Sequence, residues 1–178
     1  MLKKLLAPFA VVLTLAGCSS ANIESYQNEQ PTLDLAKYFN GMIDGYGMFQ
    51  DRSGQVVKRF HVVIASHWQN EVGTLDEDFT YSDGTKQRRI WTITKLDATH
   101  YEGRAADVVG VAKGIAAGNA LRWNYVLALP VRDKIYNVNF EDWFYLQDDK
   151  VLLNRSFMSK FGFRLGELTL SFSKRDAL

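Results

Sequence analysis

The stretch "GTLDEDFTYSDGTKQRRIW" (residues 73–91) has a run of alternating apolar and polar residues on each side of Ser82-Asp83-Gly84. Alternation with a period of two is typical of a β-strand that buries one face. A three-residue connection with glycine in the left-handed position is typical of a β-hairpin. The stretch therefore predicts two antiparallel strands joined by a tight turn.

Glu77 interrupts this alternation, because it shares the parity of Leu75 and Phe79 and so falls on the apolar face. The three-residue turn pairs Glu77 with Arg89 and Leu75 with Trp91. A carboxylate matched to a guanidinium can stay charged in apolar surroundings, whereas a lone buried carboxylate tends to become protonated. We therefore predict that Glu77 and Arg89 face each other inside the sheet.

Two interpretations of this pair follow. It is either a structural ion pair that fixes the strand register in the core, or a polar anchor at the bottom of a cavity that holds a ligand head group. A two-residue turn, Asp83-Gly84, would instead pair Glu77 with Ile90. Such a slip by one residue would move every side chain to the opposite face.

Strand-like runs continue from residue 45 to the C-terminus, with no long helical pattern between them. Turn signals separate the runs at residues 51–54, 82–84, 97–99, 130–133 and 147–149. This rhythm is typical of an antiparallel meander. Closure removes the exposed edges of a sheet, so we predict an all-β fold, a single β-barrel domain of about 8 to 10 strands over residues 33–178.

Two segments differ from this rhythm. Residues 32–41, "TLDLAKYFNG", predict a short helix with Thr32 as its N-cap and Gly41 as its end. Residues 103–119, "GRAADVVGVAKGIAAGN", are mostly small and favour a sharply bent or bulged strand at a barrel corner. A flexible flap over a cavity and a short helix across one end of the barrel are the alternatives for this second segment.

Polar residues recur among aromatic residues on other inward faces. Trp123 and Tyr125 share a face with leucines, Asp142 repeats the anomaly of Glu77, and Asn154 interrupts an apolar strand. Each is more often a satisfied core residue than a ligand contact, but together they favour a polar, partly hydrated interior. The candidate cavity or ligand residues are Glu77, Arg89, Trp91, Trp123, Tyr125, Asp142 and Asn154.

The N-terminus has the features of a lipoprotein signal peptide over residues 1–17. Lys3 and Lys4 precede an apolar run that is too short to span a membrane, and Leu15 to Cys18 match a bacterial lipobox. Lipidation of Cys18 would anchor the chain in a membrane through a lipidated tether, residues 18–32. Because Ser19 follows the cysteine, we expect a lipid-anchored outer-membrane protein that faces the periplasm, whose domain needs no membrane-binding surface of its own.

Composition excludes several classes of protein. The single cysteine leaves no disulfide or thiolate metal site, and the formal net charge of +1 argues against nucleic-acid binding. Two of the three histidines, His61 and His67, are six residues apart in an extended run, roughly 20 Å, so they cannot share a metal ion. No phosphate-binding loop or nucleophile elbow is present. We expect no metal and no cofactor.

Several motifs resemble an uncharacterised family of bacterial outer-membrane lipoproteins with a domain of unknown function. They include "FNG", "DRSG", "GTLDEDFTYSDG", "YEGRAADVVGVAKGIAAGNALRWNY", "FEDW" and "SKFGFRLGELTLSF". The resemblance spans residues 33–174 and implies an envelope lipoprotein whose barrel is lipocalin-like (calycin-type), similar to proteins that hold small hydrophobic molecules. The chain has "GYG" where true lipocalins have Gly-x-Trp, and no functional residue can be transferred from the resemblance.

Three functions are compatible with these observations. The first is a noncatalytic envelope lipoprotein that binds a lipid or other small amphipathic molecule inside the barrel. The second is a structural or interaction lipoprotein with a filled barrel. The third is an enzyme that uses Glu77, Asp142 or both as acid and base in a cavity.

Overall fold

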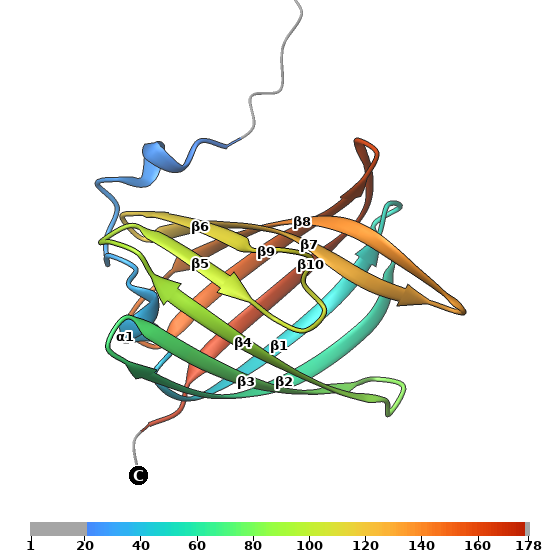
Figure 1. The fold of residues 1–178 in the computed structure, drawn as a ribbon, viewed down its shortest axis with the longest axis horizontal. Helices are drawn as coiled ribbons and strands as arrows, with labels where there is room; N and C mark the ends of the chain where they lie inside the picture. The colour runs from blue at the N-terminus through green and yellow to red at the C-terminus, as the bar shows by residue number, and fades with distance from the viewer. Residues whose placement is uncertain (1–20, 177–178) are drawn as a thin grey trace, which may run out of the picture.

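The structure of the protein is a computed structural model that describes residues 21–176. Ten antiparallel strands in chain order close into one barrel through pairing of the first strand with the last (Figure 1). They are β1 (Gly41–Asp51), β2 (Val56–Gln69), β3 (Val72–Tyr81), β4 (Lys86–Lys95), β5 (His100–Arg104), β6 (Ala112–Ala117), β7 (Ala120–Val131), β8 (Lys134–Leu146), β9 (Val151–Lys160) and β10 (Phe163–Lys174). The predicted all-β barrel is confirmed, at the upper end of the expected strand number. The predicted signal peptide and Cys18 lie outside the described residues.

The register of the β3–β4 hairpin is the predicted one. Glu77 is paired with Arg89 and Leu75 with Trp91. The amide of Tyr81 donates to the carbonyl oxygen of Thr85 at 2.9 Å, and Gly84 has a φ of 81°. A non-glycine side chain would be strained at that angle, so glycine fixes the three-residue turn. The alternative two-residue turn is excluded.

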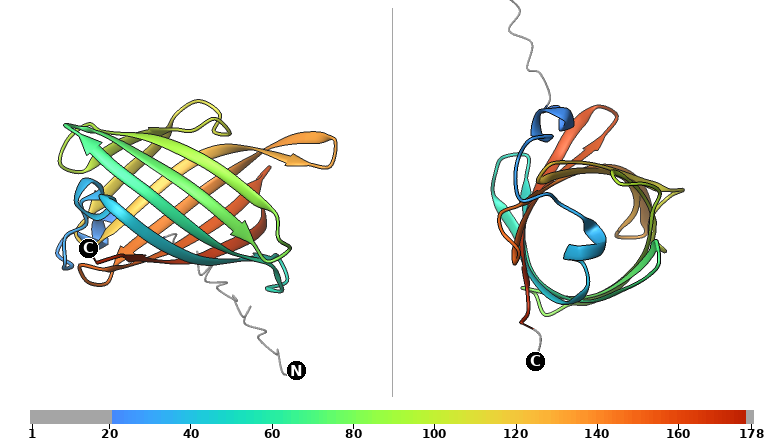
Figure 2. Two further views of the ribbon diagram at one scale, coloured as in Figure 1. Left: turned by 90° about the horizontal axis from the view of Figure 1, so that it is seen from below. Right: turned by 90° about the vertical axis from the view of Figure 1, so that its left-hand side faces the viewer.

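Helix α1 (Leu35–Tyr38) covers one end of the barrel, as the end-on view in Figure 2 shows. Its N-cap is Asp34, which accepts a 2.9 Å hydrogen bond from the amide of Ala36, rather than the predicted Thr32. The indole Nε1 of Trp68 donates to the carbonyl oxygen of Phe39 at 2.8 Å. This bond ties the residues after the helix to β2, and α1 therefore serves as a lid.

The chain before the lid packs on the outer wall of the barrel at the same end. The 3-10 helix η1 (Ile23–Tyr26) places Ile23, 2% exposed, against Ala120 and Trp143. The amide of Leu33 donates to the carbonyl oxygen of Gly118 at 2.8 Å. Packed structure thus begins well before residue 33, inside the segment that was predicted to be a tether.

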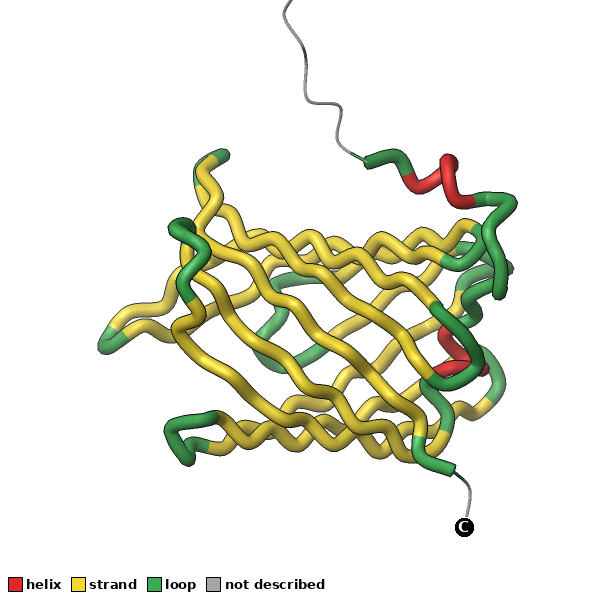
Figure 3. Tube along the Cα trace, turned by 180° about the vertical axis from the view of Figure 1, so that it is seen from behind, coloured by secondary structure: helices red, strands yellow, loops and turns green. Residues whose placement is uncertain are grey.

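The opposite end of the barrel is bounded by four hairpin turns, at residues 52–55, 82–85, 132–133 and 161–162. Figure 3 shows these turns gathered at the end away from the red helix α1. We refer to this end as the mouth. Among the described residues, no helix is long and apolar enough to cross a bilayer.

The small-residue segment differs from the single bent strand that was predicted. It forms the end of β5, a loop over residues 105–111, and β6. Its glycines leave room for one large side chain, because a Cβ at Gly103 or Gly114 would overlap the indole of Trp123. The small residues therefore accommodate an inward-pointing tryptophan instead of bending one strand.

Candidate ligand-binding cavity

The barrel encloses a cavity of about 710 Å³ that extends from the lid to the mouth. Leu35 and Phe39 line its closed end, and Lys58 and Lys86 lie at its open end. Its volume falls within the range of sites that hold drug-sized molecules. Much of the wall is aromatic, including Phe60, Phe79, Trp91, Trp123, Phe140 and Phe144.

The aromatic rings form a continuous strip across three strands. Trp91 on β4 packs edge-on against Trp123 and Tyr125 on β7, with ring centroids 5.8 and 5.5 Å apart. Tyr125 in turn stacks on Phe140 of β8 at 5.0 Å. Such pairs fix ring orientation beyond simple burial, so this part of the wall is preorganised.

The structure brings all seven candidate residues to the wall of this cavity. They are Glu77, Arg89, Trp91, Trp123, Tyr125, Asp142 and Asn154. The inward parity inferred for β3, β4, β7, β8 and β9 therefore holds. That these residues bind a ligand stays a prediction.

Arg89 has a second carboxylate partner that the sequence analysis missed. Its Nη2 lies 2.7 Å from Oδ2 of Asp107, and its Nε lies 3.0 and 3.1 Å from the two carboxylate oxygens. The predicted partner, Glu77, is farther away, with Oε2 at 3.9 Å from Nη1. Asp107 comes from the loop between β5 and β6, where it is the only acidic residue among small ones. That isolated charge was the available signal.

Glu77 is left in an environment that favours its neutral form. Its side chain is 12% exposed, and burial raises its pKa from 4.5 to about 7. Attraction to Arg89 lowers the pKa, but burial outweighs it, and the negative charge of Asp107 raises the pKa further. Glu77 is therefore close to half protonated near neutral pH.

Asp142 forms a second buried carboxyl group in the same cavity, and it is 7% exposed. Burial raises its pKa from 3.8 to about 7, although hydrogen bonds from Ser156 and Tyr125 act in the opposite direction. The hydroxyl of Ser156, which is fully buried on β9, donates directly to Asp142. Burial also raises the pKa of Tyr125, so its hydroxyl remains a donor.

Ser156 is a residue of this site that the sequence did not predict. Asn154 was predicted, and it has a structural role in addition to its place on the cavity wall. Ser156 shares the parity of Asn154 on β9, which was the signal that could have identified it. The Nδ2 of Asn154 donates to the carbonyl oxygen of Trp143 at 3.3 Å. This bond satisfies a donor of the buried Asn154 side-chain amide and links β9 to β8.

The histidines do not gather at the cavity. His61 contacts Asp44 at 2.9 Å, and His100 is the first residue of β5, at the lid end of the barrel. Within residues 21–176, no group of three or more His, Cys, Asp and Glu side chains is placed to hold a metal ion. The structure therefore offers no metal-ligand set in the part of the chain that it describes.

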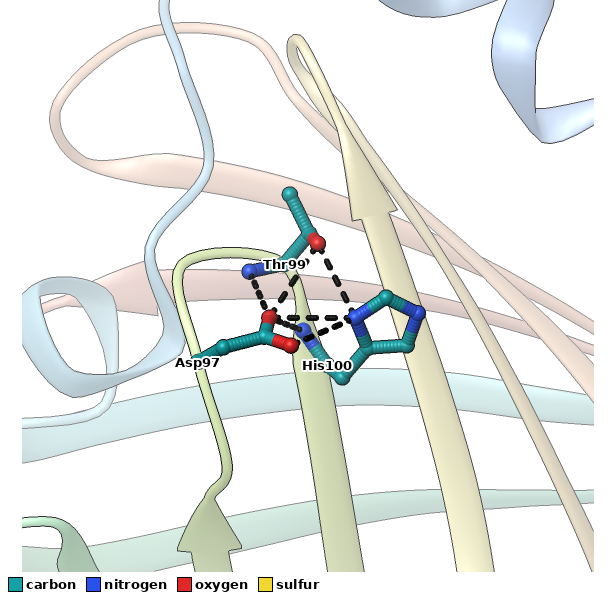
Figure 4. Close-up of polar contacts among 3 residues, drawn as sticks. All are labelled: Asp97, Thr99 and His100. Carbon is teal, nitrogen blue, oxygen red and sulfur yellow. Dashed lines mark hydrogen bonds and ion pairs between the residues drawn. The ribbon is translucent and has the colours of Figure 1, made fainter.

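The turn around His100 contains an aspartate, a threonine and a histidine in contact (Figure 4). Asp97 and the hydroxyl of Thr99 both contact the same ring nitrogen, Nδ1, at 3.0 and 3.1 Å. A nucleophile–base relay needs the hydroxyl and the carboxylate on opposite ring nitrogens. Asp97 also accepts from the amides of Thr99 and His100, so the cluster caps a turn.

A closed antiparallel barrel with a lid at one end and an internal cavity has a lipocalin-like (calycin-type) fold. The chain belongs to the family described as Protein of unknown function (DUF3833), whose profile matches residues 12–174. The resemblance to a family with a domain of unknown function is thereby confirmed. No curated protein matches the chain significantly.

Two solved structures are similar to this chain. The S-type phycobiliprotein lyase CPES from Guillardia theta has a TM-score of 0.58 at 8% identity, over 89% of this chain and 99% of the lyase. A de novo designed fluorescence-activating β-barrel has a TM-score of 0.40 at 14% identity, over 80% of this chain and 99% of the design. The likeness to the lyase supports the fold alone, and that to the design is too low to support an argument.

Proposed function

We propose that this protein is a noncatalytic lipoprotein of the bacterial envelope whose barrel binds a lipid or another small amphipathic molecule. The observation that carries this proposal is the cavity of about 710 Å³, with an aromatic wall and buried polar groups. A barrel that served only as a scaffold would fill its interior with side chains. The hollow interior therefore favours a ligand over the alternative of a structural lipoprotein with a filled barrel.

The polar groups indicate which part of a ligand they would contact. Arg89 is already neutralised by Asp107, whereas within residues 21–176 no cation lies as close to Glu77 or Asp142. A ligand amine, amide N–H or hydroxyl that donated to either carboxyl group would satisfy a buried acceptor. The apolar body of the same molecule would lie against the strip formed by Trp91, Trp123 and Phe140.

The test uses residues 19–178, which hold all ten strands, the lid and η1, and lack the predicted signal peptide and Cys18. Native mass spectrometry and solvent extraction of the purified protein should reveal a copurifying small molecule. The neutral fluorescent amphiphile N-phenyl-1-naphthylamine should bind with one-to-one stoichiometry. Absence of both a copurifying molecule and probe binding would contradict the proposal.

A matched pair of variants assigns the probe to the cavity. Leu168 lines the cavity, while its neighbour Thr169 is exposed on the outer face of β10. Leu168→Trp should fill part of the cavity and weaken probe binding, whereas Thr169→Trp should leave it unchanged. Thermal melts of both variants check that each is folded. Equal effects of the two substitutions would place the probe outside the barrel.

The envelope location rests on the N-terminal sequence. A signal peptide over residues 1–17, the lipobox ending at Cys18, and Ser19 after it support an acylated protein sorted to the outer membrane and facing the periplasm. Full-length protein should incorporate labelled palmitate and fractionate with the outer membrane, and Cys18→Ser should abolish incorporation. Incorporation that survives this substitution would contradict anchoring at Cys18.

An enzyme is the second candidate, because two carboxyl groups whose pKa values are raised to about 7 lie beside one cavity. Groups that titrate near neutral pH are suited to proton transfer. Incubation of the identified ligand with the protein should leave its mass unchanged if the protein only binds it. A change of mass that Glu77→Gln and Asp142→Asn both abolish would favour the enzyme.

A further inference from the structure

The turns that surround the mouth carry the most exposed apolar side chains of the described chain. Phe161 is 85% exposed, Phe163 is 74% exposed and Ile135 is 72% exposed. Val57, at 61%, lies on the neighbouring β1–β2 hairpin. We define the tip surface as residues 51–59, 81–87, 129–136 and 159–165. Large apolar side chains concentrated at one end of a soluble fold mark an interaction site.

Phe161 is also held in an unfavourable backbone conformation. It has a φ of 52° and precedes Gly162, which has a φ of 79°. A left-handed conformation is uncommon for a bulky residue, and asparagine is the usual residue at such a hairpin position. Neither turn stability nor core packing accounts for an exposed phenylalanine there. Its placement is explained if the ring contacts something outside the chain.

The same surface is basic. The tip surface carries eight Lys and Arg residues against three Asp residues. The four turns at the lid end carry only two basic residues against four acidic ones. These turns are residues 67–74, 95–101, 115–121 and 145–152. Lys134 and Arg164 are exposed and flank Ile135 and Phe163 directly. Apolar side chains interleaved with cations match a bilayer interface, where rings enter the acyl boundary and cations meet anionic head groups.

From this combination we propose that the mouth docks on an anionic lipid bilayer through the tip surface. The four hairpins project in the same direction from the barrel rim, away from helix α1 (Figure 1). The barrel would therefore stand on the bilayer with its cavity opening toward the lipid. This site is separate from the predicted anchor at Cys18, because the described chain begins at the lid end, opposite the mouth. It also does not depend on what the cavity holds.

Flotation with vesicles tests this proposal on residues 19–178, which lack the predicted anchor. The protein should float with vesicles of phosphatidylcholine and phosphatidylglycerol, and much less with phosphatidylcholine alone. Each basic residue near an anionic surface contributes roughly a fivefold change in binding. Arg52 and Lys134 are exposed on the tip surface and do not line the cavity, so Arg52→Gln with Lys134→Gln should weaken binding about 25-fold. Raised salt should have a similar effect.

The apolar part is tested with Phe161→Ser and Phe163→Ser, each of which should weaken vesicle binding about tenfold. Matched controls lie at the lid end, where Leu96 is exposed and Lys150 is the exposed cation of the β8–β9 turn. Leu96→Ser and Lys150→Gln should leave vesicle binding unchanged. All variants should still bind N-phenyl-1-naphthylamine, which separates this proposal from the one for the cavity.

Three results would overturn the proposal. One is equal flotation with neutral and anionic vesicles, and another is a loss of binding in the lid-end controls as large as in the tip variants. The third is a dimer, seen by sedimentation velocity without vesicles, that Phe161→Ser and Phe163→Ser dissociate. That result would assign the surface to a second copy of the chain.

Discussion

Glu77→Gln should make the protein more stable above neutral pH while leaving its stability in acid unchanged. The pKa of Glu77 is raised from 4.5 to about 7 in the folded protein, chiefly by burial. The contribution of this group to stability is therefore fully present below about pH 4.5 and is lost as the pH rises through about 7. At 1.36 kcal/mol per pKa unit, the loss amounts to about 3 kcal/mol at most. Glutamine stays neutral at every pH, so the variant should not lose this stability.

The assay is urea unfolding of wild type and Glu77→Gln from pH 4 to pH 9, followed by tryptophan fluorescence. The free energy of unfolding of the two proteins should agree at the acid end and separate with rising pH in favour of the variant. Asp76→Asn is the matched control on the same strand, because Arg88 lowers the pKa of the outward-facing Asp76. The contribution of Asp76 is fully present above its unfolded pKa of 3.8 and is lost only as the pH falls through its lower folded pKa, so this variant should be destabilised to the same extent from pH 5 to pH 9. A pH-independent difference between Glu77→Gln and wild type would refute a buried, near-neutral carboxyl group.

Three further substitutions examine other contacts of the cavity. Asp107→Asn should destabilise the fold by about 2 kcal/mol, since Arg89 loses its charged hydrogen-bond partner. It should also lower the pKa of Glu77 by removing a nearby negative charge. Unchanged urea midpoints would contradict the pairing of Arg89 with Asp107. Gly114→Val should cost about 1–3 kcal/mol because the new side chain overlaps Trp123, and exposed Lys113→Val is its control in thermal melts. Trp68→Phe should cost about 1 kcal/mol by removing the donor to the carbonyl of Phe39, and stopped-flow measurements should show faster probe release through a loosened lid.

Period-two patterns predicted the parts of this fold that depend on local chain geometry. The three-residue turn at Gly84 fixed the register, and the register placed Glu77 opposite Arg89. Parity alone then placed Trp123, Asp142 and Asn154 on the inner wall. These predictions succeeded because side-chain direction in a strand follows from residue number once one turn is known.

The missed features depend on contacts between segments that are distant in sequence. The guanidinium of Arg89 contacts Asp107 because the β5–β6 loop reaches the cavity wall, which no local pattern specifies. Small residues near Gly103 were interpreted as a bend, since the indole that fills the space above them lies on β7. Ile23 was assigned to a tether because its hydrophobic partners, Ala120 and Trp143, come much later in the chain.

The lid determines by which end of the barrel any ligand can enter and leave. Because Leu35 and Phe39 close one end, the cavity has a single opening, so a molecule must leave by the route it entered. Entry and exit then share one passage and one barrier, and the fold itself imposes no one-way flow. Net delivery would be set by the difference in chemical potential of the cargo between loading and unloading.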